Sequence, residues 1–131
     1  MAIAERKGRM VARVIPDAKT TSLRPIVLEH VAPGTTVSTD ELRSYGLLTK
    51  DGYRHGRVNH AQGEYARYVC KSITFHTNTV EGFWRLFKAS VRSTPVHISA
   101  KHMQRYLDEF TFRANHRERV NGMFDLLVGA L

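Results

Sequence analysis

Hydrophobic and polar residues alternate in blocks along this chain, and the spacing of the blocks predicts its elements. Residues 2–7 and 10–15 are rich in β-favouring side chains, and Gly8 and Arg9 lie between them. Two such runs around a glycine-containing turn predict a β-hairpin at the beginning of the sequence.

From Thr20 the pattern changes to helical spacing. Residues 20–22 are Thr and Ser, which are good N-caps, and Pro25 is expected within the first turn, where a helix tolerates proline. The predicted apolar face consists of Leu23, Ile26, Val27 and Val31. Pro33 and Gly34 should end this helix.

A short β-branched run follows at residues 35–39 and predicts a strand that ends at Asp40. Open α/β sheets place their chemistry at the carboxyl ends of strands, so Asp40 is a candidate site residue. Residues 41–46 predict a short helix or turn. The stretch from Gly46 to Ile73 is weakly periodic, which favours a loop with one or two short strands.

Two amphipathic helices are predicted in the second half of the chain. The first covers residues 78–91 and the second begins near Ser99 as N-cap. The apolar face of the first consists of Val80, Phe83, Trp84, Phe87 and Val91, and that of the second of Met103, Tyr106, Leu107, Phe110 and Ala114. After Asn121 the tail is expected to pack as a short helix or to fray. The whole chain, residues 1–131, is predicted to be a single α/β domain in which helices cover a β-sheet.

Charge and cysteine usage narrow the classes of function. Twenty Lys and Arg residues against twelve Asp and Glu give a formal net charge of +8, which favours a polyanionic partner such as nucleic acid, although a basic soluble protein would look the same. Cys70 is the single cysteine, so no intramolecular disulfide or thiolate zinc ribbon can form, and a reducing cytoplasm is expected. No apolar run predicts a membrane span.

Two carboxylates are the leading candidates for chemistry. Asp40 follows the predicted strand, and Glu81 lies in the first turn of the next strong helix, with Arg85 and Lys88 at i+4 and i+7 on the same side. A carboxylate beside two cations suits a phosphodiester site, because hard oxygen ligands hold Mg²⁺ or Mn²⁺ and cations hold the nucleic-acid backbone. Taken singly, each residue is better explained by an ordinary role, as a helix cap for Asp40 and a dipole-facing Glu for Glu81, and a surface salt bridge is the alternative for Glu81 with its cations.

The segments HTNTVEGFWRLFKASVRS and ISAKHMQRYLDEFTFRANHR, together with ERKGRMVARVIPDA, VSTDELRSY and HGRVNHAQGEYAR in the same order, resemble the catalytic domain of DDE-type insertion-sequence transposases. The resemblance covers nearly the whole chain. It is to the branch that carries an amino-terminal zinc ribbon, which is absent from this sequence.

The resemblance implies a ribonuclease-H-like (retroviral-integrase-like) mixed sheet with helices and a two-metal Mg²⁺ or Mn²⁺ site for DNA cleavage and strand transfer. Asp40 would be the second catalytic acid and Glu81 the third, with Lys88 as the accompanying base. Asn78 competes for the third position, because some members of this branch are described as using Asn there. We favour Glu81, since a carboxylate is the better ligand for a hard cation.

The sequence departs from the family pattern at its beginning. The family's first catalytic Asp lies on a strand before the hairpin, and neither Glu5 nor Asp17 matches it. The resemblance therefore predicts an amino-terminally truncated domain without its first strand, with impaired or absent catalysis. The alternative is a non-catalytic remnant that binds DNA or oligomerises, and dimerisation that covers the unpaired strand edges is a hypothesis that follows.

The residues predicted to contact DNA are Arg57, His76, Arg85, Lys88 and Arg92. His76 is singled out because it precedes Asn78 and could orient a phosphate or a metal-bound water. The spacing of His55 and His60 is no strong metal-ligand pattern, and these two are expected to be surface or DNA-facing residues. The aromatic residues around Trp84 are expected to pack in the core, with base stacking as the alternative.

Overall fold

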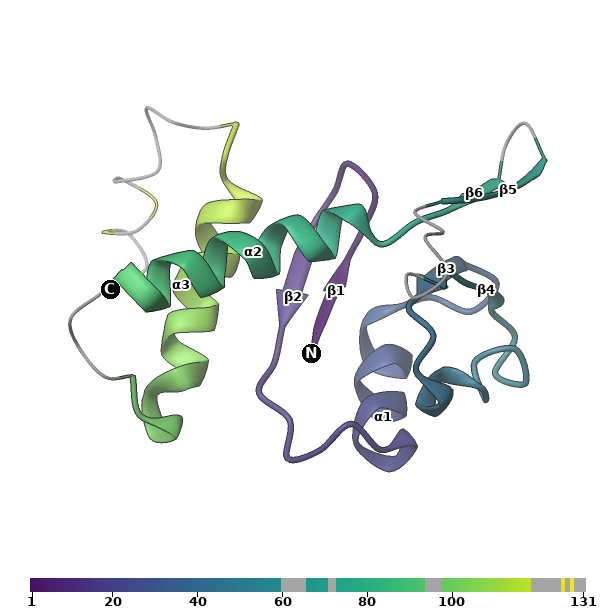
Figure 1. The fold of residues 1–131 in the computed structure, drawn as a ribbon, viewed down its shortest axis with the longest axis horizontal. Helices are drawn as coiled ribbons and strands as arrows, with labels where there is room; N and C mark the ends of the chain where they lie inside the picture. The colour runs from purple at the N-terminus through teal and green to yellow at the C-terminus, as the bar shows by residue number, and fades with distance from the viewer. Residues whose placement is uncertain (60–65, 71–72, 94–97, 119–125, 127, 129–131) are drawn as a thin grey trace. The chain divides into compact units, whose positions relative to one another are not determined.

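The computed structural model describes residues 1–59, 66–70, 73–93, 98–118, 126 and 128, which form a small mixed α/β structure (Figure 1). Two compact units divide the chain: a terminal unit, Met1–Val14 with Gly82–Leu131, and a central unit, Ile15–Glu81. The predicted α/β class is confirmed, since the structure contains both helices and small β-sheets. Of the predicted tail after Asn121, Leu126 and Val128 alone belong to the described residues.

The predicted hairpin is present in the terminal unit. Strands β1 (Ala2–Ala4) and β2 (Met10–Ala12) pair antiparallel, with Ala2 opposite Ala12 and Ala4 opposite Met10. The turn is wider than a Gly8–Arg9 dipeptide, because the amide of Glu5 donates to the carbonyl of Arg9 at 2.8 Å and Lys7 adopts a φ of 58°. A lysine therefore takes the left-handed position that the sequence would assign to the glycine.

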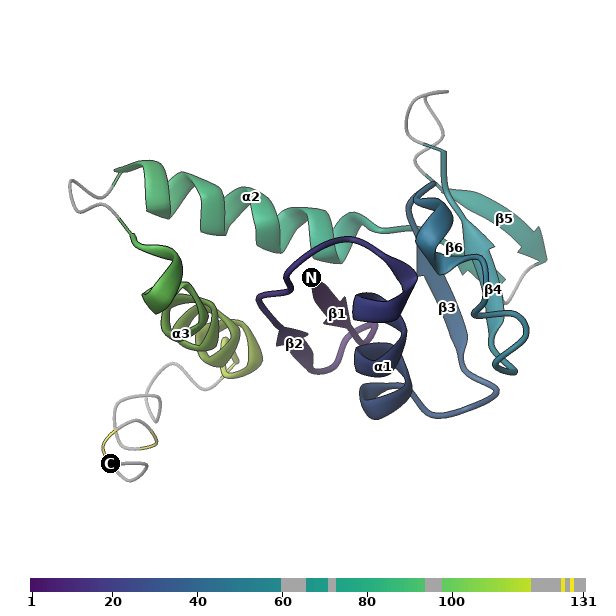
Figure 2. The ribbon, with the colours of Figure 1, turned by 90° about the horizontal axis from the view of Figure 1, so that it is seen from below.

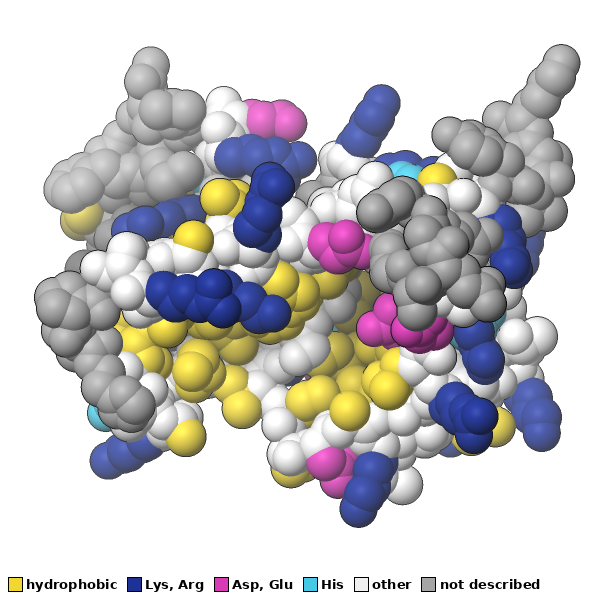
Figure 3. Space-filling view, viewed as in Figure 1, with side chains coloured by type: hydrophobic (Ala, Val, Ile, Leu, Met, Phe, Trp, Pro, Cys, Tyr) yellow, Lys and Arg dark blue, Asp and Glu magenta, His cyan; other side chains and the backbone are white. Residues whose placement is uncertain are grey.

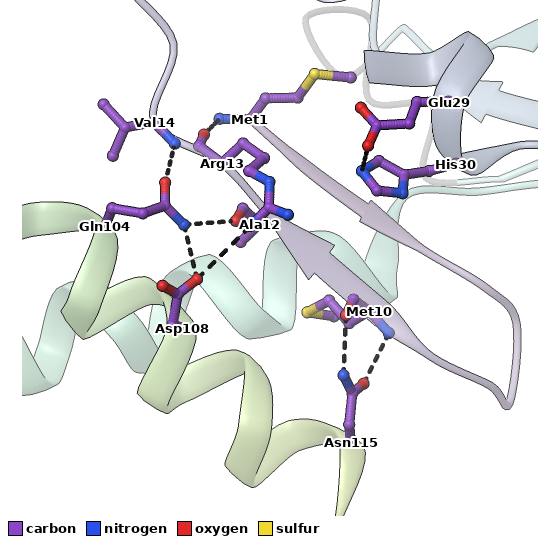
Figure 4. A network of polar contacts seen from close by, with 10 residues as sticks. All are labelled: Met1, Met10, Ala12, Arg13, Val14, Glu29, His30, Gln104, Asp108 and Asn115. Carbon is purple, nitrogen blue, oxygen red and sulfur yellow. Dashed lines mark hydrogen bonds and ion pairs between the residues drawn. The ribbon is translucent and has the colours of Figure 1, made fainter. Parts of the chain in front are cut away.

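Side-chain amides cover the outer edge of β2 (Figure 4). Asn115 accepts from the amide of Met10 at 2.7 Å and donates to its carbonyl at 2.9 Å, as a neighbouring strand would. Gln104 repeats the pattern farther along, donating to the carbonyl of Ala12 at 3.1 Å and accepting from the amide of Val14 at 2.8 Å. An exposed strand edge invites pairing with other chains, and these two amides close this one.

Helices α2 (Asn78–Ser93) and α3 (Met103–Asn115) supply the rest of the core of the terminal unit, and a 3₁₀ turn, η3 (Ala100–His102), precedes α3. The buried side chains here are Met10, Ala12, Phe83, Phe87 and Leu107. The predicted apolar face of α3 is confirmed, and so is that of α2 from Phe83 to Val91. Trp84 packs half-buried against this cluster, with its ring 5.3 Å from that of Phe83, so the core interpretation holds for it.

In the central unit the first helix, α1 (Thr20–His30), differs from the sequence prediction at its beginning. Lys19 is the N-cap and provides no capping hydrogen bond from its side chain, so the predicted capping by residues 20–22 is wrong. Asp17 orders this turn instead, because its Oδ1 accepts from the amide of Lys19 at 3.0 Å and from the hydroxyl of Ser22 at 2.6 Å. These two hydrogen bonds, that from Ser22 first, lower the pKa of Asp17.

Pro25 lies inside α1, beyond the first turn where it was predicted. Because proline has no amide hydrogen, the helix lacks its bond to the carbonyl of Thr21. Thr21 is exposed, so water can hydrate that carbonyl. The helix ends at His30, three residues before Pro33, as the pattern predicted.

Strand β3 (Thr36–Thr39) carries the predicted β-branched run, and it pairs in parallel with β4 (Arg54–Arg57). Parallel strands need a crossover of a dozen or more residues, and residues 40–53 provide it, including the 3₁₀ helix η1 (Arg43–Tyr45). Within the central unit, β6 lies beside β3 and β4 (Figure 2).

The remaining strands of the central unit, β5 (Arg67–Cys70) and β6 (Ile73–Phe75), pair antiparallel with each other. Phe75 lies flat against β4, where a Cβ on Gly56 would meet its ring at 2.3 Å. No residue with a side chain fits at position 56 while that ring stays in place. The glycine is thus required by packing and not by its backbone conformation.

None of the helices in the described part of the chain is both long and apolar enough to cross a membrane.

Candidate functional site

Asp40 lies directly after the last residue of β3, at the carboxyl end of the parallel strand pair. Its side chain is exposed. One carboxylate oxygen, Oδ1, accepts from the amide of Leu42 at 3.2 Å, which fixes the carboxylate in an Asx-type turn. The carboxylate is therefore oriented by its own turn and presented to solvent at the strand end.

Behind Asp40 lies a buried polar pair. Thr39 is 7% exposed, and its hydroxyl donates to the carbonyl of Asp40 at 2.9 Å. The Nε2 of His55, from β4, lies 2.8 Å from the same hydroxyl oxygen. Burial lowers the pKa of His55, and the nearby charge of Arg57 lowers it further. The imidazole is accordingly held in its neutral form near pH 7.

Two more side chains lie around the end of β3. Arg57 is opposite Thr39 in the parallel register and is exposed, so its guanidinium belongs to the same strand end as Asp40. Tyr45, in η1, is half-buried, and its pKa is raised by burial and then by the negative charge of Asp40. The structure therefore places the carboxylate of Asp40 close enough to affect the phenol of Tyr45, with Arg57 on the neighbouring strand at the same end.

The second predicted acid, Glu81, is exposed in the first turn of α2 and belongs to the central unit, as Asp40 does. The hydroxyl of Thr77, just before the helix, donates to the carboxylate of Glu81, and the amide of Glu81 donates to the carbonyl of Thr77 at 3.0 Å. Asn78, the alternative third ligand, is the first residue of α2 and is exposed.

Residues that could bind a metal do not form a larger group. Among the residues that the structure describes, no three His, Cys, Asp or Glu side chains converge in a way that could hold an ion. Asp40 and Glu81 are both oxygen ligands of the type that Mg²⁺ prefers. Mg²⁺ is commonly held by one or two carboxylates together with water and substrate phosphates, so either carboxylate has the donor chemistry for this ion.

Basic side chains follow one face of α2 beyond Glu81. Arg85, Lys88 and Arg92 recur at intervals of three and four residues, and all three are exposed. We call these three residues the basic stripe. Figure 3 shows Lys and Arg side chains standing out from the surface over α2, beside hydrophobic side chains. The opposite face of the helix carries Phe83 and Phe87 and is buried.

One histidine differs from the expectation of a surface residue. His55 is half-buried and hydrogen-bonded, and a DNA-facing role for it stays a prediction. His76 lies in the connection from β6 to α2 and is half-buried. Among the described residues, its Nδ1 is buried with no hydrogen-bond partner. His60 lies outside the described residues.

Comparison with known proteins agrees with the motifs of the sequence. Residues 1–115 match the family model described as the ISXO2-like transposase domain. The chain belongs to this transposase family. A similar protein is an uncharacterized transposase-like protein of Haemophilus influenzae, 30% identical over 130 residues, which cover 95% of this chain and 98% of that one. No solved structure matches the chain.

Sequence reasoning missed two side chains at this strand end, Thr39 and Tyr45, and set a third, His55, aside as a surface or DNA-facing residue. All of them are placed by the parallel pairing of β3 with β4 and by the crossover between these strands. The sequence gives one weak signal for them, since a polar, β-branched residue precedes Asp40. Nothing local to residues 54–57 indicates that they pair with residues 36–39.

Proposed function

We propose that this chain binds DNA and carries a divalent-metal site for phosphodiester chemistry, with Asp40 and Glu81 as the metal ligands and Mg²⁺ or Mn²⁺ as the ion. The observation that carries the proposal is the presentation of Asp40. Its carboxylate is exposed at the carboxyl end of a parallel strand, Oδ1 is oriented by the amide of Leu42, and Oδ2 makes no hydrogen bond with the described residues.

In this proposal the chain's own groups bind and orient the DNA strand. Asp40 and Glu81 would hold Mg²⁺ or Mn²⁺ through their carboxylate oxygens, and the ion would supply activation of a water or 3′-hydroxyl and charge stabilisation of the leaving oxygen. Arg57 is at the same strand end as Asp40 and neutralises phosphate charge there. Asn78, one helical turn before Glu81, is the competing ligand.

The basic stripe is the proposed contact to the DNA backbone. Arg85, Lys88 and Arg92 point away from the apolar face of α2 and are exposed, so they can approach phosphates without disturbing the core. Phosphate contacts of this type carry no base information, which implies binding largely independent of DNA sequence. The half-buried His76 is a proposed further contact to a phosphate or to a metal-bound water.

The proposal includes a ribonuclease-H-like arrangement and self-association. Membership of the transposase family and the parallel β3–β4 pair support the former. Self-association is tested by light scattering across a wide range of protein concentration. A strictly monomeric species throughout that range would contradict it.

The test of the catalytic proposal is nicking of a supercoiled plasmid in the presence of Mg²⁺ or Mn²⁺. Because catalysis is expected to be impaired, nicking by the parent chain should be weak, and Asp40→Asn and Glu81→Gln should each abolish it, because each removes an ionised ligand of the metal. Glu41→Gln is the matched control, since Glu41 is an exposed carboxylate beside Asp40. Loss of nicking in Asn78→Ala with retention in Glu81→Gln would identify Asn78, and not Glu81, as the third catalytic ligand.

A non-catalytic DNA-binding protein is the alternative, and the basic stripe favours it, since exposed cations bind phosphates without any metal. In that case DNA binding persists in EDTA and no nicking is detected above that of the Asp40→Asn protein. Equal nicking by the parent and by both acid variants would indicate a contaminating nuclease and would overturn the catalytic proposal.

A further inference from the structure

A chain of two hydrogen bonds leads from the interior of the central unit to the backbone of Asp40. His55 lies 2.8 Å from the hydroxyl oxygen of Thr39, and that hydroxyl donates to the carbonyl of Asp40 at 2.9 Å. A hydroxyl carries one hydrogen atom, and this one is used on the carbonyl. The Nε2 of His55 must therefore be the donor in the bond to Thr39, which fixes the proton on that nitrogen.

The parallel strands hold both members of this chain in place. His55 is opposite Val37, and the amide of Val58 donates to the carbonyl of Thr39 at 3.0 Å, so the pairing extends to the end of β3. Val58 is fully buried. The backbone around the pair is thus rigid, and the orientation of the Asp40 carbonyl depends on the Thr39 hydroxyl.

We propose that His55 is a positioning residue for Asp40, acting through the hydroxyl of Thr39 to fix the peptide that carries the metal-binding carboxylate. This inference rests on the proposed function of Asp40. Asp40 is held from two sides: Thr39 fixes its carbonyl, and the amide of Leu42 fixes Oδ1. Groups that orient a metal ligand from behind raise metal affinity by limiting the conformations in which the ligand points away.

The neutral state of the imidazole is consistent with this role. Burial of His55 and the charge of Arg57 lower its pKa, so one ring nitrogen carries a proton and the other does not. The bond to Thr39 then selects the tautomer with hydrogen on Nε2. Glutamine can place an amide hydrogen near the same point, whereas leucine has a similar volume and no donor.

The first measurement is the affinity of the full chain for Mn²⁺ alone, by titration calorimetry, for the parent, Asp40→Asn, His55→Leu and His55→Gln. We expect Asp40→Asn to lose most of the binding, His55→Leu to bind about 10- to 100-fold more weakly, and His55→Gln to stay within about threefold of the parent. Thr39→Val should resemble His55→Leu, and Thr39→Ser, which keeps the hydroxyl, should resemble the parent.

The second measurement does not depend on metal. The ¹³C chemical shift of the Asp40 carbonyl reports its hydrogen bond to Thr39, and we expect it to move in His55→Leu and to return in His55→Gln. Far-ultraviolet circular dichroism establishes that each variant is folded. If His55→Leu does not fold, the comparison of His55→Gln and Thr39→Ser with the parent still decides, because both must preserve the shift and the affinity.

The outcomes separate this inference from the proposal beneath it. Unchanged Mn²⁺ affinity in Asp40→Asn would overturn the metal site at Asp40, and the carbonyl shift would still decide whether His55 positions that residue. Loss of affinity in Asp40→Asn with parental affinity and an unmoved shift in His55→Leu would overturn the positioning role. Equal losses in His55→Leu and His55→Gln would also overturn it, because they would indicate a requirement for the ring and not for its donor.

Discussion

The terminal and central units use polar side chains for different ends. In the terminal unit, the amides of Asn115 and Gln104 bind the backbone of β2 in place of another strand. In the central unit, His55 is bonded to Thr39, and the Thr39 hydroxyl is bonded to the backbone of Asp40, whose carboxylate stays exposed. The first arrangement covers the edge of a strand, and the second presents the carboxylate of Asp40 to solvent.

The apolar parts of the two units differ in the same way. Aromatic rings dominate the terminal unit, where the ring of Phe87 meets that of Phe110 at 5.2 Å in an edge-to-face contact. The buried residues of the central unit include a threonine at the end of its parallel strand. Of the two polar networks, the one in the central unit leaves the carboxylate of Asp40 exposed to solvent. That network is therefore the better candidate for a functional site.

The largest expected effect tests the terminal unit as a scaffold. Phe87 is 6% exposed, so Phe87→Ala should lower the free energy of unfolding by about 3–5 kcal/mol, through lost burial and the cavity left behind. Urea denaturation followed by circular dichroism measures this. Leu86→Ala is the control on the same helix, because Leu86 is 64% exposed and should change stability by less than about 0.5 kcal/mol. Similar losses for both variants would mean that the buried face of α2 has been assigned incorrectly.

The next effect tests whether the amides close β2 as described. Asn115→Ala leaves the part-buried amide and carbonyl of Met10 without their partner and should cost about 1–3 kcal/mol. Asn115→Asp keeps an acceptor for the amide and removes the donor to the carbonyl, so we expect an intermediate loss. Light scattering should also show more aggregation for Asn115→Ala, because the edge of β2 is opened. Stability equal to that of the parent would remove the contrast between the two units.

A smaller effect tests the basic stripe. Lys88→Ala should lower the steepness of the salt dependence of DNA affinity by about 0.9 in log–log slope, since one phosphate contact is lost, and the change should be the same for unrelated duplexes. Fluorescence anisotropy at several salt concentrations measures it. Lys50 is another exposed lysine, outside α2, and Lys50→Ala should leave the slope as it is. A lower slope for Lys50→Ala alone would move the DNA contact away from the stripe.

The smallest effect concerns pH and the central unit. Because burial lowers the pKa of His55 in the folded chain, the unfolded chain, with an imidazole pKa of about 6.5, binds more protons just below that pH. Stability that is present above about pH 6.5 should therefore decrease as the pH falls toward the lowered pKa, with a slope well below the limit of about 1.4 kcal/mol per pH unit. Urea midpoints across this range measure it. His55→Gln should flatten the profile, and an identical profile in that variant would assign the dependence to another group.

Much of the fold could be predicted from local pattern. The period of Val80, Phe83, Phe87 and Val91 determined both the existence of α2 and its buried face, because a helix of this length buries one stripe. The β-branched run before Asp40 likewise predicted β3 and the place of the candidate acid at its end. Capping of α1 was predicted incorrectly, because several residues near Thr20 could serve and the local geometry uses Asp17.

The parallel pairing of β3 with β4 was beyond the reach of local pattern. Residues 54–57 are RHGR, which has neither the β-branched composition nor the alternation of an ordinary strand. Their strand forms because β3 supplies the hydrogen-bonding partner and Phe75 packs over Gly56. The pairing brings His55 to the hydroxyl of Thr39, so sequence reasoning found the acid and missed this contact behind it.

The sequence by itself determined the family of this chain, its basic character, the amphipathic helices and the position of Asp40, because each of these is set by neighbours in the chain or by composition. The tertiary structure alone decided that amides from α3 close the edge of β2 and that His55 reaches Thr39. These contacts join residues 105 and 16 positions apart in the chain, for Asn115 with Met10 and for His55 with Thr39. Such pairs form only when packing and strand pairing bring distant segments together, and no local pattern around either residue names its partner.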